Sequence, residues 1–200
     1  MKIADVKVTI WEWKNIPPTR YTLQVKSSGT RTAHMALVRI ICDDGTEGHA
    51  FLGSALSSLG GGAEQIAGQY KRFLVGRDPL DREYIMQKLG GWAMGSTMPV
   101  IGAIDVALWD LAGKAAGVPI HKLMGSYRSS VPAYASSVVF ETPEQYAEEA
   151  VSYKERGWTA YKIHPPGDPR LDVKICEATR AAVGDDYRLM LDSKIGRAHV

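Results

Sequence analysis

Alternating polar and apolar residues mark the first fifty positions of the chain. Residues 3–13 alternate as a half-buried strand does, and a second β-branched, apolar run covers residues 36–42. The segment Asp43–Thr46 contains an Asp-Gly pair, a strong hairpin signal, and residues 47–52 continue as a returning strand. The pattern predicts three antiparallel strands, with a loop rich in Pro, Thr, Ser and Gly, Asn15–Arg31, between the first two.

Helical periodicity replaces this alternation after the glycines at 60–62. One helical stretch is expected to run to about Leu74, and a shorter helix from Leu80 to Leu89. The clearest pattern covers Pro99–Ala116, which Gly117 ends. Apolar residues recur there at three- and four-residue steps and predict one buried stripe: Ile104, Ala107, Leu108, Leu111 and Ala115.

From Ser130 onward, predicted strands and helices alternate. The expected order is a strand over 131–140, a helix from Thr142 to Gly157, a strand over 160–164, a helix from Asp168 to Gly184 and a strand over 187–192. Strands joined through helices by short loops pair in parallel with right-handed crossovers. We therefore expect two regions, with their boundary near residues 126–130.

Composition and charge narrow the class of protein. Apolar residues make up 45% and charged residues 23% of the 200 positions, and the formal net charge is +2. These values are ordinary for a globular protein and give no reason to expect a nucleic-acid or membrane partner. No apolar run approaches the ~20 residues that span a bilayer, and the N-terminus lacks a signal-peptide pattern. Cys42 and Cys176, far apart in apolar settings, favour two reduced thiols and a cytoplasmic protein.

A specific resemblance rests on residues 103–125. The run Ala-Ile-Asp-Val-Ala-Leu-Trp-Asp-Leu-Ala-Gly-Lys at 103–114, followed by Gly-Val-Pro at 117–119 and Leu-Met-Gly at 123–125, closely resembles the signature of the mandelate racemase and muconate-lactonizing group of the enolase superfamily. The resemblance implies an α+β capping domain, residues 1–128, followed by the first β/α units of a truncated (β/α)8 (TIM-type) barrel, residues 129–194.

The end of the chain departs from that plan. Three parallel strands and two helices are less than half of the ~250 residues of a (β/α)8 barrel. Residues 195–200 match a translated frame of a common sequencing adapter, so we expect a non-native tail; a genuine C-terminal tail is the alternative. The fragment is then expected to be inactive alone.

The resemblance implies a Mg²⁺-dependent reaction that begins by removing the proton next to a substrate carboxylate. A carboxylate-held Mg²⁺ stabilises the resulting enediolate, and in relatives the first ligand closes the third barrel strand. Asp192 stands at that place, directly after an apolar parallel strand, and is the expected metal ligand. The alternative is an Asp that only caps the following loop.

Relatives usually end the second strand in Lys-x-Lys, whereas this chain has Lys162-Ile163-His164. Residues two apart on a strand point to the same side, so Lys162 and His164 are expected to face the barrel interior together as catalytic residues. A cationic Lys162 would keep His164 neutral and able to accept a proton. Within the family that the chain resembles, this departure fits acid-sugar dehydratases (hydro-lyases) and racemase-like members better than the two-lysine epimerases, and an acid-sugar dehydratase is the first interpretation.

Several alternatives stay open. A racemase, epimerase or cycloisomerase needs the same first half-reaction, and an inert interaction module is the non-enzyme alternative. The expected partner is a small carboxylate, most simply a sugar acid, and the parent enzyme is expected to be a homo-oligomer. The capping loops around Asn15–Arg31 and His49–Gly53 are suspected to bind substrate, although His49 also fits an ordinary strand histidine. Asp105 and Asp110 are expected to be structural.

Overall fold

The computed structural model describes residues 1–16, 31–53, 59, 61–91 and 98–193. The chain divides into two compact units, one of residues 1–16 and 31–129 and a second that is described over residues 130–193. Most of the predicted substrate loop (residues 17–30) and the whole predicted tail (195–200) lie outside the described residues.

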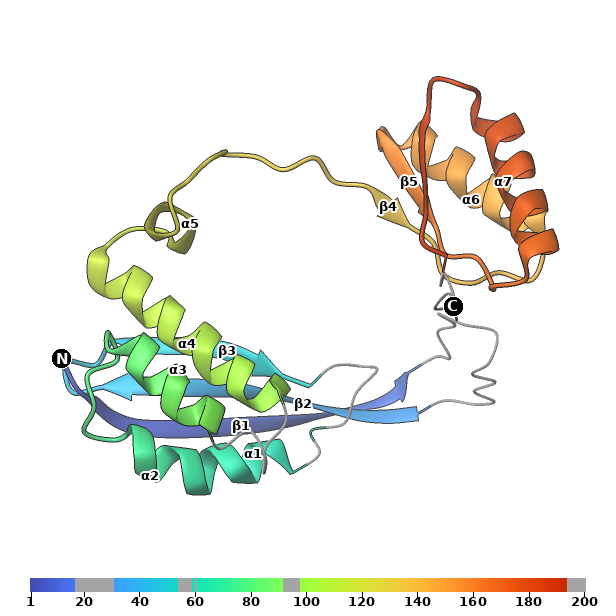
Figure 1. The fold of residues 1–200 in the computed structure, drawn as a ribbon. Helices are drawn as coiled ribbons and strands as arrows, with labels where there is room; N and C mark the ends of the chain where they lie inside the picture. Colours follow the sequence, from blue (N-terminus) through green and yellow to red (C-terminus); the bar gives the residue numbers. More distant parts are fainter. Residues whose placement is uncertain (17–30, 54–58, 60, 92–97, 194–200) are drawn as a thin grey trace, which may run out of the picture. The chain divides into compact units, whose positions relative to one another are not determined.

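The first unit contains the three predicted antiparallel strands, β1 (Ile3–Ile16), β2 (Arg31–Cys42) and β3 (Glu47–Leu52), in the order β1-β2-β3 (Figure 1). The hairpin between β2 and β3 turns at Gly45, whose φ of 84° suits glycine. Asp44 fixes the turn, because its carboxylate accepts the Thr46 N–H at 2.9 Å.

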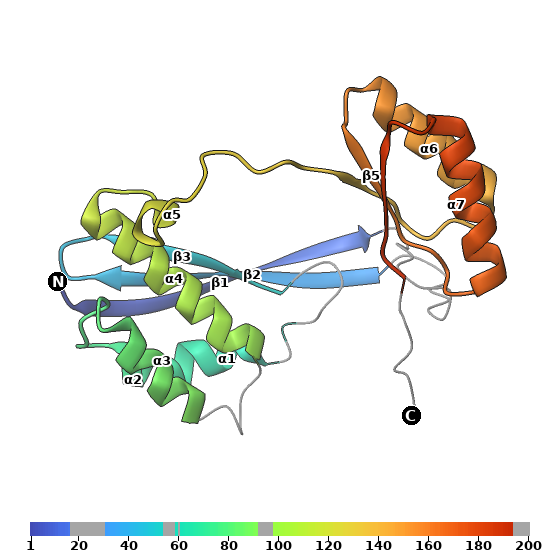
Figure 2. The same ribbon diagram turned by 45° about the horizontal axis from the view of Figure 1, so that its top comes forward.

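Helices cover one face of this sheet (Figure 2). The first helical stretch joins α1 (Gly62–Gln65), a π-helical turn η1 (Ile66–Tyr70) and α2 (Lys71–Leu74). It is followed by α3 (Arg82–Gly91), α4 (Met98–Ala116) and the short α5 (Ile120–Leu123), which the sequence pattern did not predict.

The apolar stripe of α4 forms the centre of the first core. Ile104, Ala107, Leu108 and Leu111 are fully buried, and α4 packs on β3 and β2. The prediction that Ala115 completes the stripe was wrong, since Ala115 is exposed. In this last turn α4 meets the returning segment 118–120 through Gly113, where a Cβ would lie 3.1 Å from the Val118 oxygen.

The second unit is the start of a parallel β/α arrangement. It contains β4 (Ala135–Ser136), α6 (Pro143–Glu155), β5 (Ala160–Ile163), α7 (Pro169–Val183) and β6 (Arg188–Leu191), with the strands in the order β4-β5-β6. Both strand pairs are parallel, as predicted. The expected strand over 131–140 is reduced to two paired residues, because four-residue β5 pairs with β4 only at Tyr161 and Lys162.

The predicted helix starts in this unit are confirmed. Thr142 and Gln145 form a capping box at α6, and the Asp168 carboxylate caps α7 through the N–H groups of Arg170 and Leu171. These caps fix where each strand-to-helix loop ends.

Both cysteines are free thiols. Burial raises the pKa of Cys42 to about 11, so this thiol stays protonated at neutral pH. None of the described helices is both long enough and apolar enough to span a membrane.

Candidate active site at the ends of the parallel strands

Three side chains predicted to be functional converge within the second unit. Lys162 lies in β5, His164 follows its last residue, and Asp192 follows β6. Lys162 Nζ lies 2.9 Å and His164 Nε2 3.1 Å from the same oxygen, Asp192 Oδ2. The expectation that Lys162 and His164 point to one side follows from the strand period of two, and here both reach one carboxylate.

Asp192 is held by its backbone as well as by these cations. Its N–H donates to the Ile163 oxygen at 2.9 Å and so extends the β5–β6 pairing by one residue. Its side chain is about half exposed, at 49%. The hydrogen bond from Lys162 holds the pKa of Asp192 below its usual value, so the carboxylate is ionised, as a hard-cation ligand must be.

Lys162 is the less exposed partner of this ion pair, with 21% of its side chain accessible. Its ammonium lies 5.2 Å from the ring centre of Tyr134, the residue before β4. The hydrogen bond to Asp192 raises the pKa of Lys162, and a contribution from Tyr134 acts in the same direction. Lys162 is therefore a cation in this arrangement.

The position of His164 is fixed through its backbone and its ring. Its N–H donates to Ser137 Oγ at 2.8 Å, and its carbonyl accepts from the Tyr146 hydroxyl at 2.8 Å. Nδ1 lies 2.9 Å from the Ser137 carbonyl and Nε2 lies 3.1 Å from Asp192 Oδ2, so each ring nitrogen faces an oxygen that accepts hydrogen bonds. The neutral form of the ring stays a prediction.

Sequence reasoning missed the residues that hold His164. Ser136 ends the short β4 and Ser137 follows it, and Ser136 Oγ lies 3.2 Å from His164 Nδ1. Tyr146 is fully buried in α6, and its hydroxyl also accepts the Phe140 N–H at 3.0 Å. A pair of serines at a strand end was the only available signal, and it does not identify a partner.

The fit of a metal ion rests on one residue. Asp192 supplies one ionised carboxylate at the carboxyl end of a parallel strand, the place that a Mg²⁺ site in this architecture uses. Among the described residues, no group of three or more His, Cys, Asp or Glu side chains is placed to hold a metal ion.

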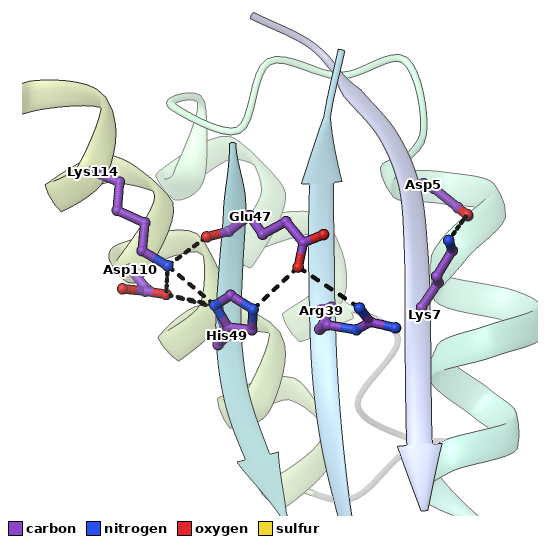
Figure 3. A network of polar contacts seen from close by, with 7 residues as sticks. All are labelled: Asp5, Lys7, Arg39, Glu47, His49, Asp110 and Lys114. Atoms are coloured by element: carbon purple, nitrogen blue, oxygen red, sulfur yellow. Dashed lines mark hydrogen bonds and ion pairs between the residues drawn. The ribbon is translucent and has the colours of Figure 1, made fainter. Parts of the chain in front are cut away.

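His49 lies in a polar network of the first unit (Figure 3). Its Nε2 is 3.2 Å from Glu47 Oε2, and its Nδ1 is 3.1 Å from Lys114 Nζ and 3.4 Å from Asp110 Oδ2. Glu47 also lies 3.9 Å from Arg39. These contacts connect β3 to α4; a substrate contact by the segment His49–Gly53 stays a prediction.

Asp105 also makes a structural contact. Its carboxylate lies 2.5 Å from Arg82 of α3, and the Arg82 guanidinium stacks 4.3 Å above the Trp109 ring. Both aspartates of the signature therefore bind within the first unit, Asp105 to a helix and Asp110 to a strand.

An antiparallel sheet covered by helices, followed by the start of a parallel β/α unit, defines a capping domain joined to a barrel. Residues 5–125 match the family model described as "Mandelate racemase / muconate lactonizing enzyme, N-terminal domain", and residues 145–196 match "Enolase C-terminal domain-like". The chain belongs to the mandelate racemase / muconate lactonizing enzyme family of the enolase superfamily.

Curated relatives in this family catalyse different reactions. The chain is 30% identical over 183 residues to the L-Ala-D/L-Glu epimerase of Clostridium acetobutylicum, covering 90% of this chain and 51% of that protein. It is 34% identical over 213 residues to the D-galactarolactone cycloisomerase of Agrobacterium fabrum (98% and 52%). It is 36% identical over 166 residues to the L-talarate/galactarate dehydratase of Salmonella typhimurium (75% and 39%).

Solved structures agree with these matches. A D-glucarate dehydratase from Agrobacterium tumefaciens complexed with magnesium superposes with a TM-score of 0.78 at 31% identity, covering 96% of this chain and 54% of that chain. A dipeptide epimerase from Enterococcus faecalis complexed with Mg and the dipeptide L-Leu-L-Tyr gives 0.80 at 28% identity (97% and 54%). The chain spans about half the length of the curated relatives it matches.

Proposed function

We propose that this chain supplies the capping domain and the first barrel strands of a Mg²⁺-dependent enzyme that removes the α-proton of a carboxylate substrate. The observation that supports it is the meeting of Lys162 Nζ and His164 Nε2 on one oxygen of Asp192, at 2.9 and 3.1 Å. Two cationic or proton-transferring groups and one anionic ligand, at the active end of parallel strands, are the parts this half-reaction needs.

In this proposal His164 is the general base. Its Nδ1 faces the Ser137 carbonyl, so Nε2 is the ring atom directed into the site and available to exchange a proton. Lys162 remains cationic beside it and attracts the substrate carboxylate. Asp192 would hold Mg²⁺ as one ligand, and the bound metal supplies electrostatic stabilisation of the negative charge that develops on the substrate carboxylate.

Among the activities of the family, we favour an acid-sugar dehydratase. Curated relatives with dehydratase names, including the L-talarate/galactarate dehydratase and a D-xylonate dehydratase, match 75% and 78% of this chain. Epimerases that use two lysines have the second lysine of Lys-x-Lys where this chain has His164. This difference also favours a dehydratase. Epimerase and cycloisomerase relatives match this chain at similar identity. Racemisation, epimerisation or cycloisomerisation is therefore the alternative activity.

Residues 1–200 alone are proposed to be inactive. An octahedral Mg²⁺ site bound through a single carboxylate would retain mostly water ligands and bind weakly, and the described residues contain no group of three or more His, Cys, Asp or Glu side chains placed to hold a metal ion. The proposed complete enzyme is a cytoplasmic homo-oligomer that binds a small sugar acid.

A chimeric enzyme tests the proposal. Residues 1–193 would be joined to the remaining barrel of the Salmonella typhimurium L-talarate/galactarate dehydratase, and uptake of solvent deuterium at the α-carbon of galactarate would be followed with and without Mg²⁺. We expect exchange in the chimera that Asp192→Asn abolishes and that exposed Asp185→Asn leaves unchanged. The 200-residue chain should show no exchange.

Two results would count against the proposal. Equal exchange by the Asp192→Asn and Asp185→Asn chimeras would remove Asp192 from the metal site. Mg²⁺-dependent turnover by residues 1–200 would show that the chain is complete as a catalyst.

A further inference from the structure

One face of the three-stranded sheet in the first unit is left uncovered by the described helices (Figure 2). The even-numbered residues of β2, among them Val38 and Ile40, are fully buried in the core that α4 completes. Because successive side chains of a strand point to opposite faces, the odd-numbered residues of β2 form the other, open face. Trp11, Trp13 and Phe51 share the open face with them and keep 46%, 51% and 66% of their surface exposed.

The strand register arranges the open face in rows of neighbouring side chains. Trp11 lies opposite Met35, and Leu37 lies between Thr9 and Phe51. The apolar rows at one end form the aromatic half of the open face, which contains Trp11, Trp13, Met35, Leu37 and Phe51. The rows at the other end form its charged half, which contains Asp5, Lys7, Arg39, Glu47 and His49 (Figure 3). Apolar and charged side chains are therefore separated along the strands.

The charged half carries lysine or arginine and acidic side chains in matched pairs. Lys7 Nζ lies 3.9 Å from Asp5 Oδ2, and Arg39 lies 3.9 Å from Glu47 Oε2. The formal charges of each pair cancel, so these pairs give an acidic or a basic partner no excess charge to bind. A twofold contact needs a surface that complements itself, and a charge-balanced surface beside an apolar one meets that need.

The size of the open face fits a weak interface between two copies. Residues 5–13 of β1 and the width of three strands give a projected face about 30 Å long and about 14 Å wide, or about 400 Å². Two such faces give about 800 Å² in total, within the range below about 1,200 Å² in which weak complexes form. The three exposed aromatic residues supply about 300 Å² of apolar surface per copy, the size of a functional patch on a monomer.

We propose that a second copy of this chain packs on the open face, sheet against sheet, about a twofold axis through the aromatic half. The aromatic halves then cover each other, and the charged halves lie at the rim, where protein interfaces are polar. This inference rests on the homo-oligomer named in the proposed function and gives that oligomer a surface. It does not depend on proton transfer by His164.

Sedimentation velocity of the 200-residue chain over a series of concentrations tests this inference. The variants are Trp11→Thr and Phe51→Thr, which remove an aromatic side chain from the open face and keep a residue that suits a strand. Ile10→Thr is the matched control, because Ile10 is 47% exposed on the same strand and points to the opposite face. Thermal unfolding of each variant checks that the sheet is intact.

We expect a concentration-dependent dimer whose dissociation constant rises about 10–100-fold in Trp11→Thr and in Phe51→Thr, because aromatic anchors dominate interface energies and each substitution occurs twice in a twofold dimer. Ile10→Thr should change the dissociation constant by less than about threefold, as an exposed substitution outside the interface does. If Trp11→Thr proves to be unfolded, Phe51→Thr decides.

Two results would overturn the inference. One is a wild-type chain that stays monomeric up to about 100 μM, above the micromolar range expected of such an interface. The other is association that the open-face variants and Ile10→Thr weaken equally, which would assign it to another surface and leave the homo-oligomer standing. Failure of deuterium exchange in the chimera would reject the proposed chemistry and leave the dissociation constants unchanged.

Discussion

Asp110 Oδ2 accepts the backbone N–H of His49 at 2.8 Å, so a helix side chain occupies the outer edge of strand β3. One turn later Lys114 Nζ donates to the Glu47 oxygen at 2.6 Å and to Asp110 at 2.7 Å. The pair satisfies an N–H and a C=O that a neighbouring strand would otherwise bind. This arrangement gives a structural reason for the Asp and Lys of the family signature.

Removing Asp110 should destabilise the first unit. Asp110→Ala leaves the His49 N–H and the Lys114 ammonium without their acceptor, which costs about 1–3 kcal/mol of unfolding free energy. Urea unfolding measures the loss. Glu64→Ala, an exposed acid of α1 in the same unit, is the control and should change stability by less than about 0.5 kcal/mol. Equal effects of the two variants would contradict the edge-capping role.

The stability that Asp110 contributes should depend on pH in the acid range. Burial acts to raise the pKa of Asp110, but hydrogen bonds from Lys114 and the His49 N–H outweigh it and leave the pKa below 3.8. A lowered carboxyl pKa stabilises the fold above about pH 4, and this stability is lost as the pH falls through the folded-state value. The difference in unfolding free energy between wild type and Asp110→Asn should therefore shrink as the pH falls from about 5 to about 2, the range in which an Asp carboxylate becomes protonated. Urea unfolding at several pH values measures this difference. A difference that stays constant would contradict the pKa direction.

Gly48 is required by the contact between β3 and α4. A Cβ there would lie 2.1 Å from the Ala107 oxygen and 2.6 Å from Leu111 Cγ, and the first of these atoms is helix backbone. Gly48→Ala should cost about 3 kcal/mol or more, or prevent folding, as measured by thermal unfolding. Gly68→Ala is the control, because nothing lies within 4 Å of a Cβ there, and it should be neutral or stabilising.

The ion pair of the second unit makes a separate prediction. In Lys162→Met the pKa of Asp192 should rise toward its ordinary value, because the hydrogen bond that lowers it is lost. Titration of the Asp192 carboxyl carbon by NMR measures this shift. Lys174→Met, an exposed lysine of α7, should leave the titration unchanged. An unchanged midpoint in Lys162→Met would show that the two groups do not interact in solution.

Local signals predicted most of the fold. The Asp-Gly turn at 44–45, the capping box at Thr142 and the Asp168 cap each act within a few residues, so the sequence alone locates them. Periodicity located α4 but not the end of its stripe, because the exposure of Ala115 depends on where the chain turns after Gly117. The two-residue β4 depends in the same way on the length of its neighbour β5.

The sequence also predicted only part of the candidate site. The strand period predicted that Lys162 and His164 face the same side, and the family resemblance assigned Asp192 to the end of the third barrel strand. The residues behind them could not be predicted, because Ser137 meets His164, and Tyr161 meets Glu149, only when separate elements pack together. Their spacing along the chain contains no period that would pair them.

The central claim is that His164 exchanges the substrate α-proton at this site. The most direct measurement is the rate of solvent deuterium uptake at the α-carbon of galactarate by the chimeric enzyme and by its His164→Ala variant, at saturating Mg²⁺. A general base typically contributes about 10²–10⁴-fold, and a loss in that range is the predicted result. A loss below about threefold would contradict the claim and assign proton transfer to another residue.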